Sequence, residues 1–379
     1  MTDFWLLLGD FTVRNVIAGA ALLGLASGVL GSYALLRGQS LLGDALSHAA
    51  LPGVALGFLV VGSRQLLPIL TGALLTGALA ALFMTLLVRR SRLKTDAALG
   101  AALSIFFAVG LVLLTYISTL NNASQAGLEA FLFGQAAAIV PSDLVIMGAI
   151  TGVSLLVVLA LWKEFKVVVF DPGFAAASLG LPVIALDLLM TIMVAFSIVV
   201  GLQMVGVVLM SAMIVAPAAA ARQWSRGLGQ MVMLSGAFGA LSGTVGALLS
   251  ASGRGLATGP LIVIVASVIV LVSLLFAPQR GLLWAGLRAA QTRKELQTRQ
   301  VLVDLYKLAL VHGDPHYGAE TGMLDSYYGV RAERTLQQLE ARNLVSSRAH
   351  MSEEGRHWAL TEQGYTEAET VLDDLGRPG

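Results

Sequence analysis

Asp44 and His48 are the residues of this chain whose types and spacing best suit chemistry inside an apolar stretch. They stand four positions apart, and His48 is the only histidine in the first 311 residues. On a helix this spacing places both side chains on one face, one turn apart. Carboxylate oxygens and imidazole nitrogens suit manganese, iron and zinc. The pattern predicts transient binding of a divalent metal ion, and Pro52 predicts a loosened helix beside it. The alternative is that Asp44 caps a helix and His48 is merely its hydrogen-bonded neighbour.

A second segment predicts a short helix between two long apolar stretches. Asp171 suits the N-cap and Pro172 the first turn, whereas Gly180 suits a helix end. A short helix with small side chains and no core of its own favours docking into a groove on a partner, and a plain connecting turn is the alternative. The candidate docking residues are Asp171, Pro172, Gly173, Ala176, Ser178, Leu179 and Gly180.

The composition places most of the chain in a membrane. Hydrophobic residues make up 56% of the sequence and charged residues 12%, against about 25% charged in soluble proteins. Residues 286–379 carry 11 Lys/Arg and 14 Asp/Glu, which leaves 24 − 11 = 13 basic and 23 − 14 = 9 acidic residues for the first 285. The sequence therefore predicts a lipid-soluble body and a polar tail. Cysteine is absent, which excludes disulfides and thiolate metal ligands.

We expect an all-α polytopic body with eight or nine transmembrane helices, since a span needs roughly 20 apolar residues. Basic residues mark the cytosolic side. Their positions give a cytosolic tail and, for nine spans, an external N-terminus. The sixth and seventh spans are separated only by Gly201–Leu202, which predicts a tight hairpin. The candidate spans are residues 13–36, 44–61, 66–88, 97–118, 143–162, 183–200, 203–221, 231–251 and 257–277.

The polar tail predicts a small cytosolic α+β domain. We expect a membrane domain over 1–280, a linker helix over 281–300 and a winged-helix-like domain over 301–379. Its expected order is helix, helix–turn–helix, hairpin and helix, with short helices over 320–329 and 330–344, strands over 345–350 and 357–361, and a last helix over 362–375. The net charge of 11 − 14 = −3 over residues 286–379 argues against binding nucleic acid. A protein-contact or regulatory role is favoured, and metal sensing by the tail histidines (His312, His316, His350 and His357) is the alternative.

Three motifs resemble the ABC-3 family of manganese, zinc and iron ABC permeases. They are Gly43–Gly53, with Asp44 and His48, then Asp171–Pro182, and then Val205–Ala221. In the last motif, Ala219 or Ala220 stands where the family often has threonine. In the tail, Leu339–Val345 and Trp358–Gly364 resemble the DNA-binding half of iron- and manganese-dependent repressors.

The resemblance implies a fold similar to that of the cobalamin and siderophore importers. It implies a second permease subunit, a cytosolic ABC ATPase dimer and an extracytoplasmic metal-binding protein as partners, besides the surrounding lipid. It also implies that Asp44 and His48 coordinate the metal in transit and that Asp171–Pro182 is the coupling helix.

We therefore expect a non-enzymatic permease subunit in the cytoplasmic membrane. ATP hydrolysis is expected on a separate chain, because no phosphate-binding loop motif is present. The manganese, zinc or iron ion is cargo, and no permanently bound cofactor is expected. The alternatives are an ABC permease for a metal chelate or another small solute, and a membrane-tethered winged-helix regulator.

Overall fold

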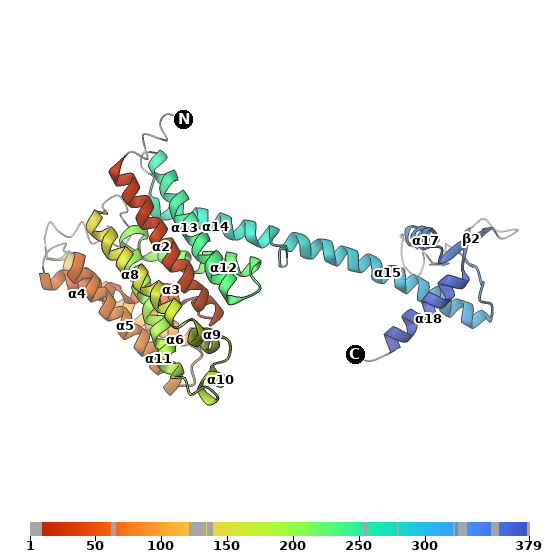
Figure 1. Cartoon of the computed structure of the whole chain (residues 1–379), viewed down its shortest axis with the longest axis horizontal. Coiled ribbons are helices and arrows are strands. Elements are labelled where there is room, and N and C mark those ends of the chain that lie inside the picture. The colour runs from red at the N-terminus through yellow and green to blue at the C-terminus, as the bar shows by residue number, and fades with distance from the viewer. Residues whose placement is uncertain are drawn as a thin grey trace. The chain divides into compact units, whose positions relative to one another are not determined.

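The computed structural model describes residues 10–61, 66–120, 134, 139–253, 256–278, 280–320, 323–324, 332–349 and 356–376. The chain divides into two compact units, Met1–Leu282 and Leu283–Gly379 (Figure 1). Each unit has a hydrophobic core of its own.

The first unit is a bundle of long helices joined by short ones. Its helices are α2 (Phe11–Leu36), α3 (Leu42–Ala49), α4 (Leu51–Val61), α5 (Leu66–Arg90), α6 (Thr95–Ser118), α8 (Pro141–Ala160), α9 (Trp162–Phe170), α10 (Pro172–Ala177), α11 (Val183–Val205), α12 (Val207–Trp224), α13 (Leu228–Ser252) and α14 (Thr258–Phe276).

Within the described residues, eight helical stretches are long and apolar enough to span a membrane, with α3 and α4 counted together. This confirms the predicted polytopic, all-α body. The helix α12 is not among the eight, yet its 18 residues would extend about 27 Å at roughly 1.5 Å per residue. Large apolar side chains such as Val60, Val112 and Val145 are exposed on the outside of the bundle, as expected for helices that face lipid.

Small residues allow close helix contact in the bundle. The helices α2 and α13 pack along their length, and a Cβ added to Gly24 would lie 2.0 Å from the carbonyl oxygen of Gly239. Nearby, the Ser235 hydroxyl donates a 2.6 Å hydrogen bond to the carbonyl of Gly28. Small residues bring backbones together where lipid gives no hydrophobic drive between helices.

One local prediction for the bundle was wrong, and one helix between candidate spans was not predicted. The break between the sixth and seventh apolar helices is at Gly206, with a φ of 87°, and not at Gly201–Leu202, because Gly201 stays helical and packs against Met210. The residues after Trp162, which lie between the candidate spans 143–162 and 183–200, form α9, which buries Phe165 and Val168. Apolar composition alone did not show this packing.

The second unit contains α15 (Leu282–His312), β1 (Ala319–Glu320), α17 (Ala332–Ala341), β2 (Val345–Ala349), β3 (Arg356–Leu360) and α18 (Glu362–Gly376). Its three strands form an antiparallel sheet in the order β1-β3-β2, and Trp358 is fully buried in its core. The hairpin and the last helix lie where the sequence places them. Strand β1 has two residues and was not predicted, and most of the expected helix over 320–329 lies outside the described residues.

Candidate functional site

Asp44 and His48 lie on α3, directly before a break in the helix. The break separates α3 from α4 at Ala50. Pro52 explains it, because proline has no N–H to donate to the carbonyl of His48 four residues earlier. The helix begins at Leu42, and Asp44 makes no side-chain capping hydrogen bond. The alternative in which Asp44 is a helix cap is therefore wrong.

The two side chains face each other as their spacing predicts. His48 Nε2 lies 3.4 Å from Asp44 Oδ1, and the side chains are 20% and 41% exposed, respectively. The Phe107 ring of α6 packs edge-on against the imidazole, with 4.8 Å between ring centroids. His48 Nδ1 is buried and has no hydrogen-bond partner within the described part of the chain. The pair thus offers an oxygen and a nitrogen at one partly open point inside the bundle.

The helices around α3 are α5, α6, α11 and α12. Gly43 allows α12 to come close, since a Cβ there would lie 3.0 Å from Ser211 Cα. In the described ranges no group of three or more histidine, aspartate, glutamate or cysteine residues is placed to hold a metal ion. Two protein ligands leave most coordination positions to water or other oxygens, so binding here would be weak and reversible.

The predicted docking segment is a short helix, α10, with the expected N-terminus. The Asp171 carboxylate accepts a 2.8 Å hydrogen bond from the backbone N–H of Phe174, and Pro172 is the first helical residue. The helix ends at Ala177, and Gly180 takes a left-handed φ of 61°. Phe174 and Leu179 are each 50% exposed. An exposed turn with apolar side chains can dock onto a partner.

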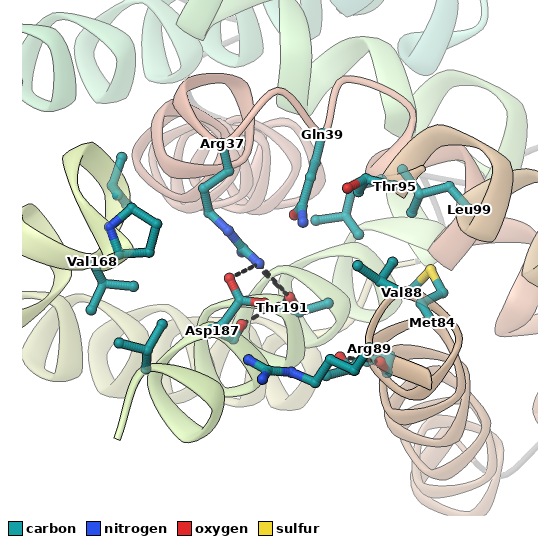
Figure 2. A pocket seen from close by; sticks show the side chains of 16 residues that line it. Arg37, Gln39, Met84, Val88, Arg89, Thr95, Leu99, Val168, Asp187 and Thr191 are labelled. Atoms are coloured by element: carbon teal, nitrogen blue, oxygen red, sulfur yellow. Dashed lines mark hydrogen bonds and ion pairs between the residues drawn. The ribbon is translucent and has the colours of Figure 1, made fainter. Parts of the chain in front are cut away.

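A cavity of about 320 Å³ is lined by residues of both α3 and α10. Leu42, the first residue of α3, and Pro172, the first of α10, both line it. Figure 2 shows Arg37 extending into this cavity toward Asp187 and Thr191 of α11. We did not single out these three residues from the sequence. A signal existed, because Asp187 is the only charged residue between Val183 and Leu202, and charge within a span is usually functional.

Comparison with known proteins places the bundle in a family. The model of the ABC 3 transport family matches residues 10–277. The manganese transport system membrane protein MntC of Bacillus subtilis (strain 168) is 45% identical over 305 residues, which cover 80% of this chain and 70% of that protein. The zinc transport system membrane protein TroC of Treponema pallidum (strain Nichols) is 42% identical over 278 residues, covering 73% and 93%.

A solved structure agrees with the sequence relatives. The chain matches PsaBC from Streptococcus pneumoniae in complex with Fab at a TM-score of 0.64 and 32% sequence identity. The match covers 74% of this chain and 97% of that chain.

Proposed function

The chain belongs to the ABC 3 transport family and is the permease subunit of a metal importer, and we propose that Asp44 and His48 bind the metal ion on its way through the bundle. The pairing of a carboxylate with an imidazole across 3.4 Å carries this proposal. This ligand set suits manganese, zinc and iron. The ion is cargo, so the chain needs no resident cofactor.

Transport requires a site that binds and then releases. With two protein ligands, one of them 41% exposed, the site exchanges ligands with water readily. Pro52 removes one backbone hydrogen bond between α3 and α4, which lets the span bend at this point. An ion that arrives from outside meets Asp44 and His48 while the inner side is closed, and it leaves when the bundle opens inward. No covalent step is involved.

The energy that opens the bundle toward the inside would come from separate subunits. We propose that α10 and the residues after it dock into a cytosolic ATPase, so that closure of an ATPase dimer moves α10 and opens the bundle. Exposed Phe174 and Leu179 supply apolar contact, and the Asp171 cap keeps the helix formed. A second permease subunit and an extracytoplasmic metal-binding protein complete the proposed importer.

The location of the second unit is part of the same proposal. Arg89 and Arg90 end α5, and Arg89 lines the same cavity as Pro172 of α10. The positive-inside rule places such basic residues on the cytosolic side, so we place α10 on that side as well. We place residues 301–379 in the cytosol as a winged-helix-like module that contacts protein rather than nucleic acid, because its net charge is negative.

The test is ATP-driven uptake of Mn²⁺, Zn²⁺ and Fe²⁺ into vesicles that contain this chain and its ATPase. Asp44→Ala and His48→Ala should each remove uptake while the complex still assembles. Ser47→Ala is the matched control, because its buried hydroxyl donates to the carbonyl of Gly43 within α3. Uptake that survives in both variants would make Asp44 and His48 structural. Uptake of a metal chelate but of no free ion would favour the chelate permease.

A further inference from the structure

A partly buried ion pair joins the connection between α2 and α3 to α11, the helix that follows α10. Arg37 is the residue after α2, and its guanidinium contacts the Asp187 carboxylate on α11. The Arg37 side chain is 7% exposed and that of Asp187 is 32% exposed. Two guanidinium nitrogens also donate to Thr191 Oγ1, at 3.3 and 3.4 Å. We call Arg37, Asp187 and Thr191 the charged latch.

The latch is held in one orientation by α11 itself. The Thr191 hydroxyl donates a 2.9 Å hydrogen bond to the carbonyl of Asp187, one turn earlier on the same helix, so its lone pairs are available to Arg37. A guanidinium has a fixed, planar set of donors and no acceptor. These contacts therefore form only when α11 and the α2–α3 connection lie in this one arrangement.

The position of the latch connects the two halves of the proposed mechanism. Arg37 is five residues before Leu42, which begins α3, and Asp187 is ten residues after Ala177, which ends α10. Leu42, Pro172 and all three latch residues line the same cavity (Figure 2). A displacement of α10 would reach Asp187 through the start of α11 and, through Arg37, the connection that leads into α3, on which Asp44 and His48 lie.

The charges in this cavity favour a closed exit for a cation. Its charged lining residues are Arg37, Arg89 and Asp187, which sum to 2 − 1 = +1. While Arg37 holds Asp187, no free carboxylate lines the described cavity, and a positive wall repels a divalent ion. When the pair separates, Asp187 becomes the one carboxylate that can accept the ion on its way out.

We propose that the charged latch is the inner gate of this permease, closed while Arg37 holds Asp187 and opened when α10 moves. The proposal rests on the proposed transport function. Asp187 and Thr191 are positioning residues in the closed state, and Asp187 takes part in cation transfer in the open state.

The sequence allows a clean test because the chain has no cysteine. The double variant Arg37→Cys/Asp187→Cys, in vesicles with the ATPase, is treated with a short bifunctional methanethiosulfonate. We expect the reduced double variant to take up Mn²⁺ more slowly than the unsubstituted chain, because it lacks the Asp187 carboxylate, and we expect cross-linking to remove the remaining uptake until reduction restores it. A cross-linked protein that transports as fast as the reduced one would overturn the gate.

A control cross-link and a single substitution distinguish failure of the proposed gate from failure of the proposed function. In Ser250→Cys/Thr258→Cys, cysteines replace hydroxyls 2.9 Å apart where α13 meets α14, and cross-linking that pair should leave uptake unchanged. Asp187→Asn should raise the amount of ATP hydrolysed per ion transported, and an unchanged ratio would contradict the gate. If the unsubstituted chain moves no metal under these conditions, it is the proposed function that fails.

Discussion

At the scale of single residues, His48 is the most constrained member of the candidate site. One ring nitrogen faces Asp44, and the other is buried without a partner among the described residues. An unsatisfied buried polar atom costs about 1–3 kcal/mol. Proteins keep such costs mainly at functional sites. Because Nδ1 makes no hydrogen bond within the residues that the structure describes that would fix the ring, the contact with Phe107 sets the direction in which His48 Nε2 points.

The first prediction concerns that packing. Phe107→Leu should keep both metal ligands but let the His48 ring turn. Half-maximal uptake should then need a higher Mn²⁺ concentration, by less than about 10-fold. This is the lower end of the loss in metal affinity seen when a group that orients a ligand is removed. Uptake against Mn²⁺ concentration measures this. The control is Phe106→Leu, since Phe106 packs on Phe83 instead. Equal shifts in the two variants would show that the ring contact has no specific role.

At the scale of elements, α10 depends on its cap. A helix of six residues is too short to be stable alone, and losing an Asp N-cap costs about 1 kcal/mol. Asp171→Ala should therefore weaken ATPase binding and lower uptake, whereas Asp171→Ser keeps a capping oxygen and should retain most of both. Co-purification of the ATPase at increasing salt would measure the effect. If the alanine and serine variants behave alike, the cap does not matter for coupling.

The contact between α2 and α13 gives a second prediction for elements. A Cβ at Gly239 would lie 2.0 Å from the carbonyl oxygen of Gly24, so Gly239→Ala must push the two helices apart. Overpacking of this kind costs about 1–3 kcal/mol, and the unfolding temperature in detergent should fall. Gly100→Ala is the control, because a Cβ there would meet no atom of another helix within 4 Å in the described part of the chain. A similar unfolding temperature for both variants would show that the bundle tolerates the separation.

At the scale of the whole molecule, the two units have separate cores. The core of the second unit draws on residues from Val301 to Ala368, and the main core of the bundle ends at Ile262. Trp358 is fully buried, and Trp→Ala in a core costs about 3–5 kcal/mol. Trp358→Ala should speed amide hydrogen exchange throughout the second unit and leave the bundle protected.

The same variant tests what the second unit contributes to transport. Because the family match ends at residue 277, we expect Trp358→Ala to keep ATP-driven uptake under saturating metal. Tyr317→Phe, a change outside that core, is the control for substitution in the second unit. Loss of uptake with an intact bundle would show that the second unit is required for transport and does more than regulate it.

The sequence by itself determined the class of the protein and its local features. Composition separated an apolar body from a polar tail, and i, i+4 spacing placed Asp44 beside His48 as the structure has them. Cap chemistry placed Asp171 and Pro172 at the start of α10. These features depend on neighbours in the chain, so short-range rules suffice. The metal role of the pair and the docking role of α10 stay predictions.

Only the tertiary structure decided which helices meet. Arg37 and Thr191 are 154 positions apart, Gly24 meets Gly239, and Phe107 packs on His48. In soluble helices a polar face shows which side is buried. Helices in lipid are apolar on all sides, so the sequence pattern does not indicate the partner of each face. Close packing of small residues selects those partners, and that selection brought Arg37 and Asp187 together.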